Sequence, residues 1–422
     1  MKDTFVISCP IDTYSGYGSR SRDLVKALIE LDKYEVKIMP QRWGNTPWDF
    51  IENNPEWHFL KPHLLPVGQP LTEKPNVWAQ VTVPNEFQPI GDYNIGFTAG
   101  IETTICAPQW IEGLNRMDLN IVSSQHSKQV FENATFQVKD KNTNQVTGEI
   151  KLTKPVEVLF EGADLDLYKP TKSSFPLEIK ESFAYLFVGH WMQGDLGEDR
   201  KNVGLLVKAF FETFKNKKTK PALILKTSGS GTSYMDRESI LKKINAIRAS
   251  VNSNNLPNIY LLHGEFTDEE MNSIYNHPKI KSMISLTKGE GFGRPLLEFS
   301  LSQKPIITTN WSGHIDFLKP EFTSLIGGEL KNVHPSAAVK DMILQESKWF
   351  APNHGEIGHY LKDVFENYKN YVGKGKRQAY YSKTNFSWEG MKQLLGDILE
   401  NNVTTQVELK IPTLTKIDLS KL

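Results

Sequence analysis

Residues 287–298 read TKGEGFGRPLLE and directly follow a short apolar run at 282–286. Gly291 and Gly293 free the backbone, and Pro295 has the fixed φ that suits the first turn of a helix. The stretch therefore predicts a strand, a glycine-rich loop and a helix. In open α/β sheets such loops lie at the carboxyl ends of the strands, where backbone N–H groups can approach a ligand at a helix N-terminus.

The same alternation of strand and helix recurs along the chain. Short, β-rich apolar runs alternate with segments whose apolar residues have helical spacing, which is typical of parallel sheets covered by helices on both faces. The predicted strands are 4–9, 36–39, 77–81, 94–97, 119–123, 156–160, 183–188, 222–226, 259–262, 282–286 and 305–309. The predicted helices are 20–31, 201–214, 235–251, 267–275 and 337–350. The predicted fold class is α/β.

The length of 422 residues predicts two to three domains. The alternation pauses at 168–180, a stretch with Pro, Ser and Lys and little periodicity, so we expect a linker between two sheets there. Residues 137–154 are polar with alternating flanks, which indicates an inserted hairpin. Residues 403–422 show little helical character and are treated as a tail.

Composition limits the function classes. The only cysteines are Cys9 and Cys106, which excludes a disulfide framework and a cysteine-rich zinc site. No apolar stretch approaches the roughly 18 residues of a membrane span, and we see no secretory signal, so we expect a cytoplasmic protein. The first 170 residues hold 16 of the 49 basic and 22 of the 49 acidic side chains, which leaves the remainder with a net charge of +6. The second half therefore favours an anionic ligand.

Two further turns could contact phosphate. Gly16 and Gly18 follow the first strand as a Gly-x-Gly turn that lacks the third glycine and the acidic partner of a dinucleotide site; the alternative is a tight strand-to-helix turn. Arg200 and Lys201 open a helix after the strand that ends near His190. Cations oppose the helix dipole there, so a bound anion would explain them, although a solvated pair is the alternative.

Glu290 and Glu298 have seven residues between them. Glu290 lies on the loop, and we expect Glu298 to face the cleft one turn into the helix. Carboxylates in these positions can accept hydrogen bonds from sugar or ribose hydroxyls, while the N–H groups between them can bind phosphate or sugar oxygens. The alternative for Glu298 is an ordinary helix-capping acid.

This Glu-x7-Glu segment, within residues 289–313, resembles the donor-site signature of the retaining glycosyltransferases of family 4. Residues 162–170 are similar to the segment that closes that family's first domain, and residues 200–202 resemble its phosphate-binding segment. Residues 263–270 look like its turn beside the nucleotide base, and residues 386–389 resemble the start of its last helix.

The resemblance covers most of residues 1–402 and implies the GT-B architecture, in which two Rossmann-like domains face a cleft and the second holds most of a nucleotide-diphosphate sugar. On this basis residues 1–168 form the acceptor-side domain and residues 169–385 the donor-binding domain. Residues 386–402 form a helix that crosses back to the first domain.

The resemblance also implies roles for residues. Lys201 and the backbone after Glu290 would neutralise the diphosphate, Glu298 would hold the ribose, and Glu290 would contact the sugar. The expected donor-binding residues are Gly16, Gly18, His190, Arg200, Lys201, Gly291, Phe292, Gly293 and Glu298. The expected catalytic residues are Glu290, Lys201 and Glu102.

The chain departs from the family in two places. Members commonly carry an arginine where this chain has His190, which could replace it only when protonated, so Arg200 is expected to share the role. Members also often carry a catalytic-side histidine after a first-domain strand. Glu102 is the candidate substitute here, and His126, expected to begin a surface helix, is a weaker one.

Asp164 and Asp166 fit the Asp-x-Asp pattern that holds a divalent metal on another glycosyltransferase fold. The pair overlaps the interdomain segment at 162–170, and short acidic pairs are frequent by chance. We therefore predict no metal. The nucleotide sugar is a substrate, and no cofactor is expected.

The predicted activity is transfer of a hexose or pentose, with retention, to a hydroxyl of a glycan, lipid, protein or hydroxylated nucleic-acid base. A nucleotide-sugar hydrolase or epimerase of the same fold and a non-catalytic binding subunit remain alternatives, although the intact Glu290, Glu298 and Lys201 argue against the last. Tryptophans could stack on a sugar or base, but aromatic side chains are more often core. These are Trp43, Trp48, Trp57, Trp78 and Trp110.

Overall fold

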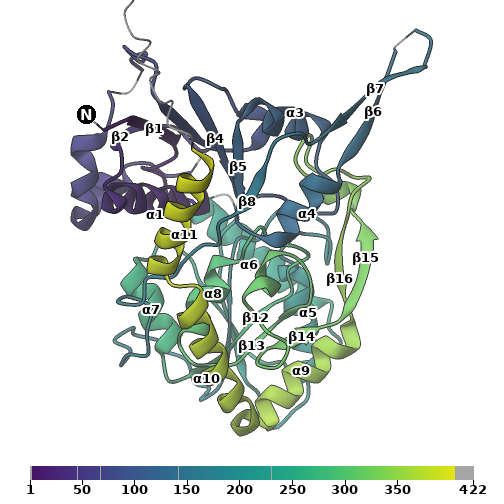
Figure 1. Cartoon of the computed structure of the whole chain (residues 1–422). Coiled ribbons are helices and arrows are strands. Elements are labelled where there is room, and N and C mark those ends of the chain that lie inside the picture. Colours follow the sequence, from purple (N-terminus) through teal and green to yellow (C-terminus); the bar gives the residue numbers. More distant parts are fainter. Residues whose placement is uncertain (1, 45, 67, 141, 230, 404–422) are drawn as a thin grey trace, which may run out of the picture.

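The computed structural model describes residues 2–44, 46–66, 68–140, 142–229 and 231–403. Within these ranges the chain forms two six-stranded sheets, and neighbouring strands in both sheets are parallel. The two units stack on one another, with helices around each sheet (Figure 1). The predicted α/β class with two Rossmann-like units is confirmed. From residue 404 on, the predicted tail lies outside the described residues.

The first sheet has the strand order β2-β1-β3-β4-β5-β8. Its strands are β1 (Thr4–Cys9), β2 (Glu35–Pro40), β3 (Val77–Val81), β4 (Tyr93–Thr98), β5 (Leu119–Val122) and β8 (Val156–Val158). The segments between them include α1 (Gly16–Leu31), α2 (Phe50–Asn53), α3 (Pro108–Arg116), α4 (Gln125–Asn133) and the 3-10 helices η1 (Pro55–His63) and η2 (Pro84–Glu86). The order reverses between β1 and β3, which leaves a crevice at the carboxyl ends of these strands.

The second sheet has the corresponding order β11-β10-β9-β12-β13-β14 and reverses between β9 and β12. Its strands are β9 (Ala184–Val188), β10 (Ala222–Lys226), β11 (Ile259–Leu262), β12 (Ile280–Ser285), β13 (Ile306–Thr309) and β14 (Ser324–Ile326). The helices of this unit are α5 (Val203–Phe214), α6 (Tyr234–Ala249), α7 (Asp268–Asn276), α8 (Arg294–Ser300), α9 (His354–Glu366), α10 (Tyr368–Asn385) and the 3-10 helix η3 (Gly313–Asp316).

The last described helix, α11 (Trp388–Asn402), returns to the first unit as predicted and lies beside α1 (Figure 1). Trp388, Met391 and Leu395 are buried in the same apolar cluster as Leu24 and Leu28 of α1. The first unit therefore completes its core with residues from the end of the described chain.

Two antiparallel strand pairs form separate two-stranded sheets outside the six-stranded ones. The strands β6 (Thr135–Lys139) and β7 (Val146–Lys151) pair where the sequence indicates an insertion, and Figure 1 shows this hairpin projecting from the first unit. The strands β15 (Gly328–Asn332) and β16 (Lys348–Pro352) pair at the side of the second unit.

The predicted helix at 337–350 is wrong. Only the 3-10 helix η4 (Pro335–Ala337) starts there, and the segment ends in β16. Asp341 has a φ of 60°, which a helix does not accommodate, and Val339 and Ile343 exchange backbone hydrogen bonds across a tight turn. The apolar spacing arises instead from a small separate cluster that includes Val333, Ala337, Ile343 and Trp349.

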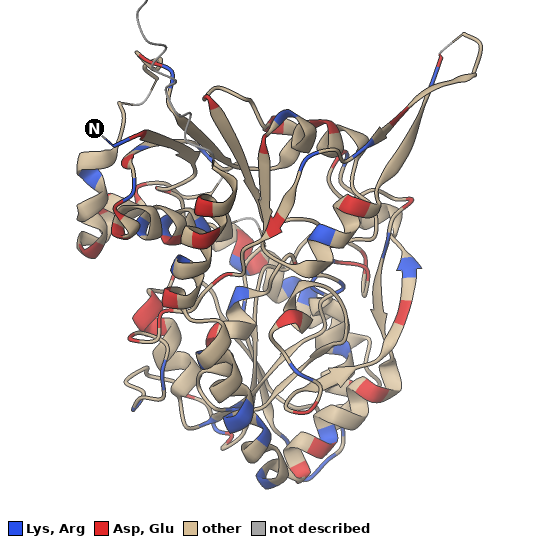
Figure 2. Ribbon diagram, in the orientation of Figure 1, with Lys and Arg blue, Asp and Glu red and all other residues tan. Residues whose placement is uncertain are grey.

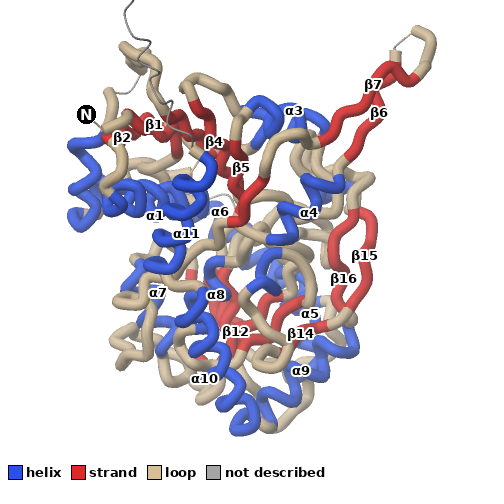
Figure 3. The backbone as a smooth tube through the Cα atoms, in the orientation of Figure 1, coloured by secondary structure: helices blue, strands red, loops and turns tan. Residues whose placement is uncertain are grey.

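Figure 3 shows the strands of the two sheets in red and the helices around them in blue. Figure 2 shows that the strands of these sheets carry few charged side chains. Strands that are covered on both faces must be apolar throughout, which explains the continuous apolar runs in the sequence. Within the described residues, no helix has both the length and the hydropathy needed to span a membrane.

Candidate active site

The two units face each other across a cleft of about 480 Å³. Its walls are loops at the carboxyl ends of strands, after β1 and β4 in the first unit and after β9, β10 and β12 in the second. The N-termini of α1 and α8 also border it. A ligand in this cleft would contact both units.

Glu290, on the loop after β12, forms the centre of a charged cluster on the second-unit wall. Lys201 Nζ donates hydrogen bonds to Glu290 Oε1 and Oε2 at 2.5 and 2.7 Å. An Arg200 guanidinium nitrogen lies 3.6 Å from Glu290 Oε2 and 3.3 Å from Glu102 Oε1, across the cleft. The structure thus brings Arg200, Lys201, Glu290 and Glu102 together.

The charge states of this cluster follow from burial and from its neighbours. Burial opposes ionisation of Glu290, but the adjacent charges of Lys201 and Arg200 outweigh it and hold the pKa of this carboxyl at about 2. Burial, assisted by the charge of Lys201, lowers the pKa of His190, whose Nδ1 lies 3.0 Å from Ser228 Oγ. A neutral His190 at pH 7 leaves Arg200 and Lys201 as the positive charges next to Glu290.

Glu298 lies one turn into α8 and is buried, but it is not among the residues that line the cleft, contrary to expectation, and its carboxylate is already occupied. Arg294 Nε donates to Oε1 at 2.9 Å, and the Tyr275 hydroxyl donates to Oε2 at 3.3 Å. Arg294 borders the cleft, pairs with Asp23 of the first unit and lies 3.7 Å from Glu161. A ribose that uses Glu298 must therefore share this carboxylate with Arg294 or displace it.

The environment of Glu298 predicts a pH-dependent contribution to stability. Burial raises the pKa of this carboxyl to about 7, with the charge of Arg294 opposing the shift. Between about pH 5 and pH 7 the folded state retains a proton that the unfolded chain has lost, so stability falls as pH rises through this window. We expect Glu298→Gln to remove this loss.

Calorimetric melting temperatures at half-unit pH steps test this expectation. The melting temperature of Glu298→Gln relative to the wild type should rise from about pH 5 to pH 7 and then level off. The exposed Glu321, changed in the same way, is the control and should show no such trend. A constant difference for Glu298→Gln would contradict the raised pKa.

The structure separates the two glycines of the first turn. Gly16 begins α1 at the cleft, and no described atom lies within 4 Å of the place a Cβ would take. A Cβ on Gly18 would lie 2.2 Å from the Thr13 carbonyl oxygen. Gly18 therefore permits a close backbone approach, whereas Gly16 leaves open space toward the cleft.

Replacing each glycine by alanine should show which of the two is required for packing. We expect Gly18→Ala to lower the free energy of unfolding by about 1 to 3 kcal/mol, because backbone must move to admit the methyl group. Gly16→Ala should leave stability unchanged or raise it slightly, since alanine favours helix. Urea unfolding of both variants measures the difference, and a greater loss in Gly16→Ala would overturn this reading.

The glycine-rich loop of the second unit packs directly on the first. A Cβ on Gly291 would lie 2.4 Å from the Ala99 carbonyl oxygen, and one on Gly289 would lie 2.0 Å from that of Glu102. These glycines let the two units approach closely, and the approach places Glu102 next to Arg200.

The remaining predicted donor contacts of this loop, Phe292 and Gly293, differ in role. The Phe292 ring is buried against Phe317, with centroids 4.9 Å apart, so its side chain belongs to the core. Gly293 is the N-cap of α8 with a φ of 99°, a left-handed conformation that favours glycine.

Sequence reasoning missed Arg294 and Tyr17 on the cleft wall, and it named Trp43 only as one of five tryptophans that could stack on a ligand. Arg294 stands between the two glutamates of the motif, yet its pairing with Glu298 has no signal in the spacing. Tyr17 and Trp43 both border the cleft and stack with ring centroids 4.0 Å apart. Among the tryptophans considered as stacking surfaces, Trp43 lies at the cleft, whereas Trp78 and Trp110 are core.

His126 begins α4, a surface helix as expected in which only Ser127 and Phe131 are buried, but its own side chain is half-buried. Its ring packs against Trp311 with centroids 4.7 Å apart, and burial lowers its pKa to about 4.

The Asp164 carboxylate caps its own turn. It accepts backbone N–H hydrogen bonds from Asp166 at 2.9 Å and Leu167 at 3.3 Å. In the part of the chain that the structure describes, no group of three or more His, Cys, Asp or Glu side chains is placed to hold a metal ion. Metal independence itself remains a prediction.

No protein-family model and no curated protein sequence matches the chain. Solved structures match it at low identity. HepE from Anabaena, in complex with UDP and glucose, is 12% identical, with 94% of this chain and 100% of that chain covered and a TM-score of 0.57. Sucrose-phosphate synthase from Thermosynechococcus elongatus is 13% identical, with 95% and 99% covered and a TM-score of 0.62. A glycosyltransferase from Rickettsia africae ESF-5 is 12% identical, with 96% and 99% covered and a TM-score of 0.60.

These likenesses extend over almost the whole chain and therefore include both sheets, the cleft and the returning helix. At such identities they establish architecture rather than activity. The chain has the GT-B fold.

Proposed function

We propose that the protein is a retaining glycosyltransferase that moves a sugar from a nucleoside-diphosphate sugar to an acceptor hydroxyl. The observation that carries this proposal is the buried cluster of Arg200, Lys201 and Glu290 at the interdomain cleft. Fixed positive charges in a buried site stabilise a departing diphosphate more strongly than charges in water would.

The residues of the cleft fit distinct parts of such a donor. Arg200 and Lys201 would neutralise the diphosphate, Glu290 would contact the sugar, and Glu298 would bind the ribose once Arg294 yields. In the reaction, the bond between the anomeric carbon and the phosphate oxygen breaks, and the acceptor oxygen attacks on the same face. Its proton passes to the departing phosphate oxygen, so catalysis rests on charge stabilisation and positioning.

The ligands of the matched structures indicate where to begin with donors. HepE is described with UDP-glucose, and an Escherichia coli protein with UDP-2-fluoro glucose. We therefore propose a UDP-hexose as donor. The acceptor would meet the first-unit wall at Tyr17 and Trp43, whose stacked rings suit a sugar or another flat ligand. We also place the enzyme in the cytoplasm, because Cys9 and Cys106 are free thiols.

A panel of nucleotide sugars, screened by thermal stabilisation, tests the donor. A donor at 100 times its Kd should add about 2.7 kcal/mol to the free energy of unfolding. Product formation, with the anomeric configuration read by NMR and repeated in excess chelator, then tests retention and metal independence. Donor cleavage without any acceptor would favour a hydrolase, stabilisation without turnover would favour a binding subunit, and no stabilisation by any donor would contradict the proposal.

A further inference from the structure

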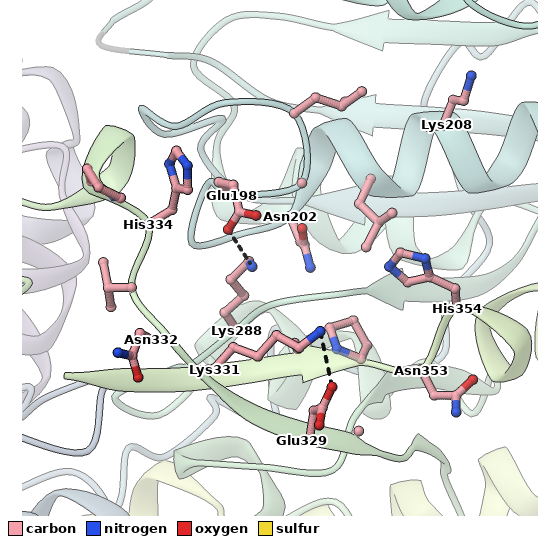
Figure 4. A pocket seen from close by; sticks show the side chains of 18 of the residues that line it. Glu198, Asn202, Lys208, Lys288, Glu329, Lys331, Asn332, His334, Asn353 and His354 are labelled. Carbon is pink, nitrogen blue, oxygen red and sulfur yellow. Dashed lines mark hydrogen bonds and ion pairs between the residues drawn. The ribbon is translucent and has the colours of Figure 1, made fainter. Parts of the chain in front are cut away.

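A second cavity, of about 1120 Å³, borders the same loops that carry the charged cluster. It lies between the start of α5, the β15–β16 hairpin and the start of α9 (Figure 4). Asn202, directly after Lys201, and Lys288, two residues before Glu290, both line it. The proposed reaction uses neither side chain.

The side-chain amide of Asn202 is buried without a hydrogen-bond partner among the described residues. Asn202 is the N-cap of α5 with a φ of 58°, but its side chain does not cap the helix. Its exposed fraction is 0%, and among the described residues neither Oδ1 nor Nδ2 has a hydrogen-bond partner. Figure 4 shows the amide directed into the space between Lys288 and Lys331. Because an unpaired buried amide is unfavourable, this geometry points to a ligand in the cavity.

The charged side chains around the cavity form only weak ion pairs with one another. Lys288 is almost fully buried, and its Nζ lies 3.4 Å from Glu198 Oε2, a long separation for an ion pair. Lys331 pairs with Glu329 at 3.1 Å, but both side chains are more than half exposed, so that pair contributes little. Lys208 lines the same wall, but its Nζ is directed away from the cavity (Figure 4): it donates to the Ser250 carbonyl oxygen and Oγ at 3.0 Å and lies 3.5 Å from Glu212 Oε1.

The positive ends of two helix dipoles also border the cavity. The N-termini of α5, with 12 residues, and α9, with 13 residues, both border the cavity. Asp199 and Asn353 cap their first N–H groups, so the helices act through their dipoles. His334 and His354 also line the wall and can donate hydrogen bonds. Lys288 and Lys331 thus face the carboxylates of Glu198 and Glu329, while Asp199 is engaged with the first N–H groups of α5, and the Asn202 amide and the two histidines supply further hydrogen-bond donors.

We propose that this cavity binds a small polyanion, a molecule with several phosphate or carboxylate groups, and that its occupancy alters donor binding. The second part rests on the proposed function. The Lys288 backbone N–H donates to the Arg200 carbonyl oxygen at 2.8 Å, so a ligand that draws on Lys288 or Asn202 acts on the loops that hold Arg200, Lys201 and Glu290. Burial lowers the pKa of Lys288, and an anion beside its Nζ would raise that pKa again.

Calorimetric titration of citrate and of inorganic phosphate into the full chain, at constant ionic strength, tests the site. We expect saturable binding of at least one probe. Asn202→Gly removes the amide at a backbone conformation that glycine adopts freely, and it should raise the Kd about tenfold or more. Asn216→Gly is the matched control, because Asn216 has a φ of 59° and is exposed outside the cavity. The Kd of the probe for the Asn216→Gly variant should equal its Kd for the wild type.

Charge variants give changes of opposite sign. Lys331→Gln should weaken the binding of the probe. Glu198→Gln should strengthen it, because Lys288 is then released for the anion. Lys218→Gln, at an exposed position away from the cavity, should change nothing. The absence of saturable binding, an unchanged Kd in Asn202→Gly, or equal weakening by Lys218→Gln would overturn the site.

UDP titrations with and without saturating citrate or phosphate test the coupling. A change in the Kd of UDP must appear reciprocally in the Kd of the probe. Loss of probe binding in Lys201→Ala but not in Asn202→Gly would assign the anion to the cleft and overturn the cavity. An unchanged Kd of UDP would overturn the coupling. If UDP does not bind, the proposed UDP donor fails, and the coupling is measured with the nucleotide that the donor panel identifies. If no nucleotide sugar binds, the proposed function and the coupling fail together, whereas the direct probe titrations still decide the cavity.

Discussion

Replacing Lys201 by alanine is expected to weaken donor binding and slow turnover by roughly 10- to 150-fold, the range of a charge-assisted hydrogen bond. Lys201 donates to both carboxylate oxygens of Glu290, so the variant also leaves that buried carboxylate with Arg200 as its remaining cation. Breaking a buried pair in this way lowers the free energy of unfolding by about 3 to 5 kcal/mol.

The binding effect must therefore be separated from the stability effect. UDP affinity by calorimetry and steady-state turnover should be measured at a temperature well below the melting point of the variant. Lys201→Ala combined with Glu290→Gln should recover part of the stability, because no unpaired carboxylate remains, without recovering turnover. Lys218→Ala serves as the exposed control. Normal UDP affinity and turnover in Lys201→Ala would remove Lys201 from the site.

The two glutamates of the motif should respond differently to the same change. Glu290→Gln should reduce turnover and leave the Kd of UDP nearly unchanged, because its contact with the sugar strengthens as charge develops on the ring. At pH 8, above the raised pKa of this carboxyl, Glu298→Gln should instead weaken UDP and the intact donor together, because a neutral amide replaces the charged acceptor of the ribose hydroxyls. Each substitution keeps the shape of the side chain.

Calorimetric titration of UDP into both variants separates these roles, with the melting temperature of each as the control for folding. Arg294 adds a condition, since it donates to Glu298 at 2.9 Å and must yield to the ribose. Equal weakening of UDP in both variants would show that the glutamates do not have separate roles. No effect in either variant would reject the donor site.

Much of the fold follows from the sequence because parallel strands that are covered on both faces must be apolar. The runs at 4–9 and 222–226 illustrate this, and both are strands in the structure. The crossing of the last helix was implied only by the family resemblance. The helix predicted at 337–350 failed because its apolar residues serve a turn and an edge strand rather than one helical face.

The candidate site was predictable where a local pattern marks it. Glu290, Arg200 and Lys201 lie on loops after strands, and strand topology brings such loops together. Contacts between the units have no local pattern. The pairing of Arg294 with Asp23, for example, joins residues 271 positions apart. Within the first unit, the stacking of Trp43 on Tyr17 is equally without a local signal, because it depends on how a loop folds back over α1.

The returning helix α11 has a consequence for biosynthesis. Its residues Trp388, Met391 and Leu395 complete the core that α1 begins, so the two halves of one hydrophobic cluster leave the ribosome more than 350 residues apart. Domains generally fold in the order in which they are made. Here the unit that is synthesised first must wait, with part of α1 uncovered, until the second unit has emerged, and this interval is when nascent chains would be most exposed to aggregation and to chaperone binding.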